Sequence, residues 1–597
     1  MKKTAIVILV LGIGFFMTNC DDYLEVVPQD AYTDATLFQT EDDLILFLNT
    51  VYNQALGFSL TDNWPNRGVD LYTLWTDDGY GARECCSGSN LSDFEFGAAK
   101  VPNQYNNPYE RIRQVNEFLR YAPQAENSFA DPGVYRRYIG EARFFRAYQY
   151  HKLSAFFGAV PLVLEPFTDQ LSPRNTRLSV FEWVDAELAD IANDLPESPE
   201  QRGRISKWAA MALRARHLLY AIDWHPDTAS LYTRAEPILQ DIYANSGHSL
   251  EPGADGFARL FTKAGEMTSE ALWTKYYSQT TLGGSNSQTG LSHGKPFHSL
   301  PPGSAGNSGN RNSNSTFNAT SRMVEAFQSS NGLDIRDPAN TLYDINNPWA
   351  NRDPRLDVTI IHSGDELPRR NASGIADTYV VNPHPLEGEV TLDNVSTRNN
   401  QVRTGYWFKK YSTDFNWLEL NNSKFADSPY HFIRFSEVIL MYAEAVLGNA
   451  NDVGTAMNLV NEVRDRVGMP AVTATGPGDA LDRILYERRI EFAGEGDHRY
   501  YDIRRHRLGE DLFIGTLPGG GDKGIVYGIP VGTTADNPEE NFPQGTLDDA
   551  SKVPVGTKEF NEFFYAPIIP DQAFERNPLL FDDPVDFGPW VSFFDQE

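Results

Sequence analysis

Cysteines, basic side chains and long apolar runs are all scarce in this sequence of 597 residues. Three cysteines are too few for a disulfide scaffold, and no zinc-ligand spacing of cysteine and histidine is found near them. The 51 basic side chains are outnumbered by 81 acidic ones, which gives a net charge of −30. Such a surface excludes nucleic acid as a partner, because that binding depends on neutralising phosphates. It also favours neutral over polyanionic ligands.

The first twenty residues combine a basic head, an apolar run and a cysteine. Lys2 and Lys3 precede an apolar stretch over 5–17, which is shorter than the ~20 residues of a membrane-spanning helix. This order is typical of a secretory signal peptide, so we expect residues 1–19 to be removed. Cys20 is then the expected lipidation site of a bacterial lipoprotein. Without Lys2 and Lys3 the mature chain carries a net charge of −32.

Each cysteine leaves an alternative open. Asn19 departs from the small residue that is usual before a lipidated cysteine, so the chain could instead be a plain secreted protein in which Cys20 is coincidental. Cys85 and Cys86 are adjacent, and such a pair either closes a strained eight-membered ring or stays as two thiols. We expect the pair to constrain a local loop.

Apolar periodicity predicts helices in two blocks of the sequence. The expected helices cover 41–57, 108–121, 133–157, 179–195, 205–222, 228–246, 431–448, 451–467 and 478–494. Between the blocks, about 278–430 is rich in glycine, serine and asparagine, and its strand-like pieces are 358–361, 378–381 and 406–409. The sequence therefore predicts an all-α dominated fold: one domain over 20–597, whose helical scaffold covers about 35–277 and 431–505. A loop-rich, partly β, ligand-facing part covers about 278–430 and 506–560.

Several motifs occur in a fixed order along nearly the whole mature chain. They are CDDYLEVVPQ (20–29), GEARFFRA (140–147), FGAVPL (157–162), GRISKWAA (203–210), RDPRL (352–356), IRFSEVILMYAEA (433–445), ERRIEFAGEG (487–496) and PIIP (567–570). In this order they resemble the SusD/RagB family of outer-membrane lipoproteins. The resemblance implies a scaffold of tetratricopeptide-like helix pairs that binds glycan without catalysis. It also implies a partner, a SusC-like TonB-dependent transporter, and a lipid anchor facing the cell exterior.

Paired carboxylates are the strongest argument for an enzyme. Glu487, Glu491 and Glu495 are spaced by four residues on one helical face, and glycoside hydrolysis needs two such groups. Arginines crowd the same segment at ion-pair spacings, however, and guanidinium groups keep a carboxyl pKa low, the opposite of a general acid. We therefore expect a structural ion network.

A glycine motif also suggests nucleotide binding. Gly519, Gly521 and Gly524 match the Gly-x-Gly-x-x-Gly spacing of a nucleotide-binding loop, but that site needs a helix after the glycines. The segment after them reads as extended, so we expect a loop that binds no nucleotide.

The predicted glycan site combines aromatic side chains with planar polar groups on loops, because sugars stack on rings and hydrogen-bond through their hydroxyls. The expected residues are Trp64, Asp70, Trp75, Asp77, Asp78, Tyr80, Arg83, Tyr277 and Phe297. Tyr276 and His298 are further candidates. Tyr72 and Trp75 could instead pack into the core, and Trp273 is expected in a buried strand.

We expect no cofactor and no catalytic or metal-binding residue. The favoured function is capture of an oligosaccharide or polysaccharide, neutral rather than anionic, and its delivery to the transporter. Two alternatives stay open at this point. One is a binder of peptide or another nutrient in the same architecture, and the other is a surface glycoside hydrolase.

Overall fold

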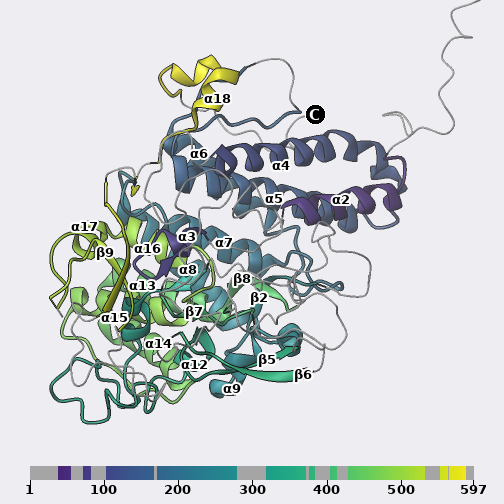
Figure 1. Cartoon of the computed structure of the whole chain (residues 1–597). Coiled ribbons are helices and arrows are strands. Elements are labelled where there is room, and N and C mark those ends of the chain that lie inside the picture. The colour runs from purple at the N-terminus through teal and green to yellow at the C-terminus, as the bar shows by residue number, and fades with distance from the viewer. Residues whose placement is uncertain are drawn as a thin grey trace, which may run out of the picture.

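The structure is a computed structural model dominated by helices, as the sequence predicts (Figure 1). It describes residues 38–55, 71–81, 102–166, 171–277, 301, 317–370, 376–383, 404–412, 428–518, 520–530, 552–561, 564–565 and 567–585. Within these ranges, no helix is both long enough and apolar enough to cross a membrane. Cys20, Cys85 and Cys86 lie outside the described residues.

Helices of the first block carry most of the scaffold. They are α2 (Glu41–Ala55), α3 (Leu71–Leu74), α4 (Pro102–Tyr121), η1 (Ala122–Ser128), α5 (Pro132–Phe157), α6 (Arg177–Ile191), α7 (Lys207–Leu219), α8 (Thr228–Asn245), α9 (Gly253–Arg259) and η2 (Lys263–Met267). The later helices are α11 (Ser321–Ala326), α12 (Arg355–Thr359), α13 (Phe435–Ala450), α14 (Val453–Asp465), α15 (Pro477–Glu491), α16 (His498–Arg505), α17 (Gly509–Phe513), α18 (Asp571–Arg576) and η8 (Pro578–Phe581). All nine predicted helices are present, and their ends differ from the prediction by a few residues.

Local capping explains where several of these helices begin and end. The Ser206 side chain accepts a hydrogen bond from the Ala209 amide at the start of α7, and Asp227 caps the Ser230 amide of α8 in the same way. Helix α5 ends at Gly158, whose φ of +81° suits a residue without a Cβ. Helix α13 ends at Asn451 in the left-handed conformation.

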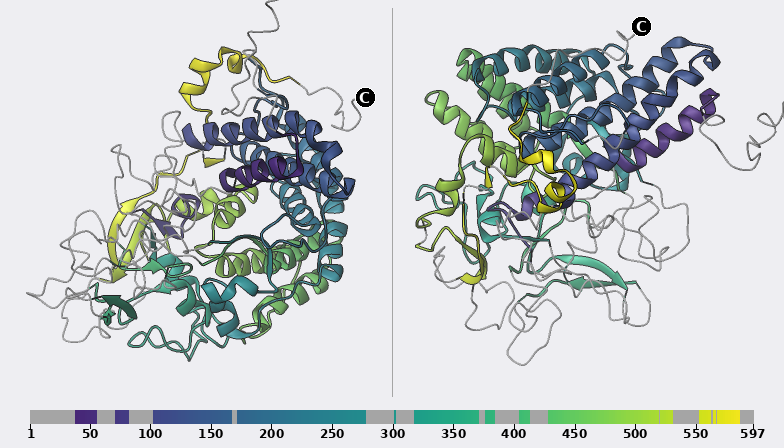
Figure 2. Two further views of the ribbon diagram at one scale, coloured as in Figure 1. Left: turned by 90° about the vertical axis from the view of Figure 1, so that its right-hand side faces the viewer. Right: turned by 90° about the horizontal axis from the view of Figure 1, so that it is seen from above.

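Consecutive long helices pack side by side in antiparallel pairs. Contacts join α5 to α6, α6 to α7 and α7 to α8, after which α8 packs on α13 and α13 on α14. Figure 2 shows these helices following one another in a curve, with β9 (Ile525–Pro530) and β10 (Lys552–Thr557) at the opposite edge. The largest apolar cluster runs through this curve and includes Phe144, Leu213 and Ile439. The helical scaffold therefore has one continuous core from the first block of helices to the second.

Helix α5 is buried on nearly every side, which the sequence predicts from its lack of a polar face. Its charged side chains are paired inside the protein. Arg143 donates to both carboxylate oxygens of Glu187, at 3.0 and 2.7 Å, and Arg146 donates to Glu187 at 3.0 Å. Buried charge is thus balanced between α5 and α6 rather than exposed.

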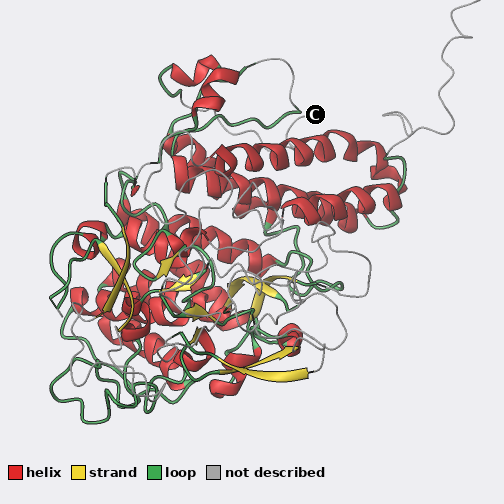
Figure 3. Ribbon diagram, viewed as in Figure 1, coloured by secondary structure: helices red, strands yellow, loops and turns green. Residues whose placement is uncertain are grey.

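The strands are short, and β2 packs on α5 through Trp273 and Phe144 (Figure 3). They are β1 (Gly79–Tyr80), β2 (Ala271–Lys275), β3 (Asn318–Ala319), β4 (Ile360–Ile361), β5 (Glu366–Arg370), β6 (Ala376–Val380), β7 (Trp407–Phe408) and β8 (Tyr430–Arg434), followed by β9 and β10. One sheet has the order β1-β3-β7-β4, and the other strands form antiparallel pairs, β2–β8, β5–β6 and β9–β10. Trp273 lies buried in β2, as predicted.

Two boundaries predicted from the sequence are wrong. The segment 431–434 was expected in a helix, but it is strand β8, because it pairs with β2 through Trp273 and Ile433 before α13 begins. The segment 358–361 was expected as a strand, but α12 continues to Thr359 and only two residues form β4. In both cases the apolar run is continuous, so periodicity alone cannot place the change from helix to strand.

Candidate functional site

The segment 71–81, which contains α3 and β1, is held by buried ion pairs from the second helical block. Arg499 donates to the two carboxylate oxygens of Asp77 at 3.0 and 3.1 Å. Arg489 lies 3.1 Å from Asp77 and donates its Nε to Asp78 at 2.8 Å. The two aspartates therefore fix this segment to α15 and α16.

The charge balance around Asp77 favours an ionised carboxylate. Burial by itself raises the pKa of this group. The guanidinium groups of Arg489 and Arg499, with that of Arg322 at 3.7 Å, outweigh burial. Together they hold the pKa of Asp77 far below its usual range. Asp77 is therefore unsuited to act as a general acid.

Lys558 holds the same segment from the C-terminal part of the chain. Its buried Nζ donates to the carbonyl oxygens of Leu74 at 2.8 Å and Gly79 at 2.7 Å, and also to that of Thr76. The three carbonyl oxygens accept from all three N–H groups of the Lys558 ammonium, so it needs no carboxylate partner for its hydrogen bonds. Backbone geometry between α3 and β1 is thus fixed by one side chain.

Aromatic rings pack beneath α3. Tyr72 and Trp75 meet edge to face at 5.5 Å between ring centroids, and both contact Phe156 of α5 and Tyr500 of α16. Tyr72 and Trp75 are each 6% exposed and belong to an apolar cluster. Their rings therefore pack as the core alternative predicts. Direct contact of Trp75 with a glycan stays a prediction.

The other predicted site residues fall into two groups. Tyr80 is buried and donates its hydroxyl to the Val555 carbonyl at 3.1 Å, while Tyr277 is buried in a separate cluster with Phe257 and Phe261. Asp77, Asp78, Trp75 and Tyr80 thus come together in one buried segment, and Tyr277 does not join them. Trp64, Asp70, Arg83, Phe297 and His298 lie outside the described residues. Tyr276 is half-buried beneath the guanidinium of Arg202.

Asp497 is a candidate that sequence reasoning missed. It lies half-buried at the start of α16, and the described part of the chain offers its side chain no hydrogen-bond or ion-pair partner. Tyr148 and Tyr501 are close enough for this charge to act with burial in raising the pKa of each phenol. A carboxylate beside phenols suits hydroxyl recognition. Sequence spacing places Tyr501 one turn after Asp497 on α16, but Tyr148 comes from α5, so the sequence does not show that the two phenols meet there.

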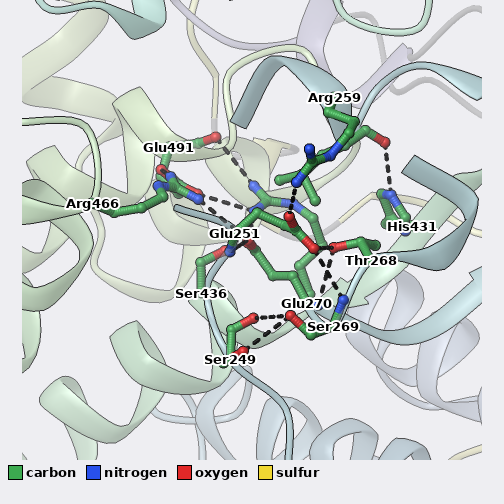
Figure 4. Close-up of polar contacts among 12 residues, drawn as sticks. Ser249, Glu251, Arg259, Thr268, Ser269, Glu270, His431, Ser436, Arg466 and Glu491 are labelled. Carbon is green, nitrogen blue, oxygen red and sulfur yellow. Dashed lines mark hydrogen bonds and ion pairs between the residues drawn. The ribbon is translucent and has the colours of Figure 1, made fainter. Parts of the chain in front are cut away.

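The carboxylates of α15 belong to a buried ion network (Figure 4). Glu491 accepts from Arg434 at 3.0 Å and from Arg466 at 2.5 Å, and Arg434 also donates to Glu495 at 2.8 Å. Burial raises the pKa of Glu491, but the surrounding arginines outweigh it and hold that pKa well below its usual range. The predicted structural network is therefore present.

The partners in this network differ from those that helical spacing suggests. Glu487 pairs with Arg355 and Arg464, which lie outside α15, and Arg505 pairs with Glu444 of α13. Long-range partners thus replace the expected pairs within one helix. Among the residues that the structure describes, no group of three histidine, cysteine or acidic side chains could hold a metal ion.

The fold and this site define a helical scaffold that presents an anchored loop segment and uses its interior carboxylates as ion pairs. A family model described as the SusD family matches residues 269–584, and the chain belongs to this SusD/RagB family. A second model, described as starch-binding and associating with the outer membrane, matches residues 22–219. That description fits a peripheral outer-membrane protein.

Individual relatives agree with this assignment. The chain is 24% identical over 550 residues to SusD-like protein P25 of Formosa agariphila, covering 85% of this chain and 90% of that protein. A SusD-like protein of Bacteroides ovatus is 22% identical, covering 84% and 82%. A crystal structure of a SusD-like carbohydrate-binding protein from Bacteroides fragilis superposes with a TM-score of 0.71 at 23% identity, covering 91% and 100%. The described fold is thus shared with solved SusD-like proteins.

Proposed function

We propose that this protein is a surface-exposed, non-catalytic lipoprotein that captures an oligosaccharide or polysaccharide for import. The observation that carries the proposal is membership of the SusD family along most of the chain. Similar solved structures include one named a carbohydrate-binding protein and another named a laminarin-binding SusD-like protein, the latter with a TM-score of 0.57. The net charge of −30 favours a neutral glycan.

The proposed site extends from the anchored segment 71–81 to the residues on either side of it in the sequence. Trp64 and Asp70 precede this segment and Arg83 follows it, and the ion pairs and the Lys558 contacts hold the segment itself. Asp497 adds a carboxylate near Tyr72. Asp77 and Asp78 support the site through arginine pairing, and their direct contact with sugar remains part of the proposal, as for Tyr80, Tyr277 and Phe297.

Gel retardation by glycan tests the function and the site together. The soluble chain from residue 21 is run through gels that each contain one neutral polysaccharide. We expect retardation by at least one glycan. Trp64→Ala removes one stacking ring and is expected to weaken the glycan affinity about tenfold, since stacking contributes ~1 kcal/mol or more. Asp497→Asn removes the negative charge of a side chain that would accept hydrogen bonds from sugar hydroxyls, and it is expected to weaken the glycan affinity severalfold.

Asp479→Asn is the control variant, because it changes a partly exposed aspartate that is paired with Arg483, and it should bind as the parent does. Release of sugar product during the run would favour the glycoside hydrolase instead. Absence of retardation by every glycan would favour a binder of peptide or another nutrient. Retardation unchanged in both site variants would reject the site and keep the function.

Lipid anchoring through Cys20 and delivery to a SusC-like TonB-dependent transporter complete the proposal. In whole cells, Cys20→Ser is expected to move the protein from the outer-membrane fraction to the soluble fraction, because the acyl chains supply the membrane affinity. Labelling of intact cells with an impermeant reagent measures surface exposure in parallel. Unchanged membrane fractionation of Cys20→Ser would contradict the anchor. Co-purification with the transporter in the parent chain tests the partner.

A further inference from the structure

Three arginines meet where α5 ends, α6 begins and α16 ends. Arg177, the first residue of α6, lies with its guanidinium 4.1 Å from the centroid of the Trp224 ring and with its carbon chain against Gly158. Its Nε is buried, and no acceptor for this guanidinium is found among the described residues. A stacked and partly buried arginine thus keeps its buried Nε–H without an acceptor in the described part of the chain.

Arg504 reaches the same place from α16. Its Nη2 donates to the Phe156 carbonyl at 3.3 Å and to the Tyr565 carbonyl at 2.5 Å. The residue is 5% exposed, and its Nη1 is buried without an acceptor in the described part of the chain. Phe156 lies two residues before Gly158, so the unused donors of Arg504 and Arg177 lie near each other at the end of α5.

The charges at this junction are not balanced. Arg507 is half-exposed and lies 3.4 Å from Asp223, which is next to Trp224 in the chain. The carboxylate of Asp223 raises the pKa of Arg177, while the two like charges of Arg504 and Arg507 lower it. Burial, and then the charge of Arg504, lower the pKa of Arg177 to about 9.

Two other buried arginines are paired with carboxylates. Arg143 donates to Glu187 and Arg355 donates to Asp353, each at 2.7 Å. A buried guanidinium without a counter-charge is costly, and its unused N–H groups add to that cost. A planar fork of donors suits the oxygens of a sulfate or carboxylate group. The positive end of the α6 dipole adds to the preference for an anion.

We propose that Arg177, Arg504 and Arg507 form a binding site for an oxyanion, a sulfate or a carboxylate group, at the junction of α5, α6 and α16. Arg177 and Arg504 supply the buried donors, and Arg507 lies at the exposed edge. The net negative charge of the whole chain does not oppose this site, because the local excess is positive and close contacts dominate over distant charges.

The oxyanion has two possible sources. Phe156 contacts both Tyr72 and Trp75 beneath α3, so the arginine site adjoins the proposed glycan site. The group is therefore either a free inorganic anion or an acidic substituent of the captured glycan, and the second source would replace the neutral glycan that the net charge favours. The recognition chemistry is the same in both cases, and the test separates them.

Thermal unfolding of the soluble chain in increasing sodium sulfate, at ionic strength held constant with chloride, tests the site. We expect a saturable rise in Tm, because an anion that binds only the folded state stabilises it. Arg177→Gln is expected to weaken the apparent sulfate affinity about tenfold. Arg113→Gln, which alters an exposed pair with Glu117 on α4, is the matched control. The general stabilising effect of sulfate raises Tm without saturation and by the same amount in every variant.

Arg507→Gln provides a second variant at an exposed position, in case the buried substitution impairs folding. It is expected to weaken sulfate binding severalfold while leaving Tm without sulfate nearly unchanged. Glucuronate and a sulfated oligosaccharide are titrated beside inorganic sulfate. Tighter binding of the oligosaccharide, lost in both variants, assigns the site to a glycan substituent, and equal binding assigns it to a free anion. A rise in Tm that does not saturate, or that is the same in Arg113→Gln and Arg177→Gln, would overturn the proposal.

Discussion

Replacing Arg434 by methionine is expected to destabilise the protein by about 3–5 kcal/mol. Arg434 donates to Ser436 at 2.7 Å, to Glu491 at 3.0 Å and to Glu495 at 2.8 Å, and it also pairs with Glu270. Its removal leaves three buried carboxylates with fewer positive charges than they need. Desolvation of the uncompensated carboxylates, rather than the lost attraction alone, sets the size of this effect.

Urea unfolding followed by circular dichroism measures this loss. Arg113→Met, which breaks an exposed pair with Glu117, should change stability by less than about 1 kcal/mol and serves as the control. Arg434→Lys should lie between the two, because it keeps the charge and loses the planar fork of donors. A loss below about 1 kcal/mol in Arg434→Met would mean that Arg466 and Lys410 neutralise the carboxylates without it.

Mild acid is expected to destabilise the protein by several kcal/mol between about pH 6.5 and pH 4. Burial lowers the pKa of His217 and of His431 to about 4 each, and lowers that of His151 well below 6.5. An unfolded histidine titrates near 6.5, so in this window the unfolded chain binds more protons and stability falls with falling pH. At pH 5 each of these histidines lowers the free energy of unfolding by about 2 kcal/mol relative to neutral pH.

Burial keeps these rings neutral, and it outweighs the carbonyl hydrogen bonds of His217 and His431, which raise the pKa. The Nε2 of His431 lies 2.9 Å from the Leu260 carbonyl, which it can only donate to, while its Nδ1 lies 2.7 Å from the Thr274 hydroxyl. His151 and His217 face each other through their Nδ1 atoms at 3.0 Å, so only one of the two can carry a proton there. A second proton would set two donors against each other.

Urea midpoints measured at pH 7, 6 and 5 test the acid sensitivity. In His431→Asn, whose amide can both donate and accept, the drop between pH 7 and pH 5 should shrink by about 2 kcal/mol. His248→Asn alters a more exposed ring near the Ser269 carbonyl and serves as the comparison. A midpoint that stays level down to pH 5 would show that these rings are not buried in solution.

The helices could be predicted from the sequence because their signals are local. Ser206 and Asp227 mark helix starts, and the apolar spacing after them continues for several turns. Strand β8 was not predicted because its apolar residues continue without a break into α13, and only the pairing with β2 distinguishes strand from helix. Helix α16 was not predicted as a separate helix, since its eight residues are mostly aromatic and charged.

The site was predicted less completely because its parts come from distant segments. The run from Asp70 to Arg83 carries a local mix of aromatic and polar residues, which predicts a glycan site in this segment. Nothing in that mix shows that Asp77 and Asp78 face Arg489 and Arg499, about four hundred residues later. The proximity of Asp497 to Tyr148, and the meeting of Arg177 with Arg504, likewise exist only in the folded chain.

The contacts of Lys558 also bear on the order in which the protein folds. Its Nζ closes loops of 479 to 484 residues when it reaches the carbonyls of Leu74, Thr76 and Gly79. A chain that is synthesised from its N-terminus cannot form these contacts until residue 558 has been made, and loop closure over so many residues is entropically costly. Segment 71–81 is thus synthesised long before the side chain that holds it. The proposed site around this segment would be complete only after Lys558 has been added to the chain.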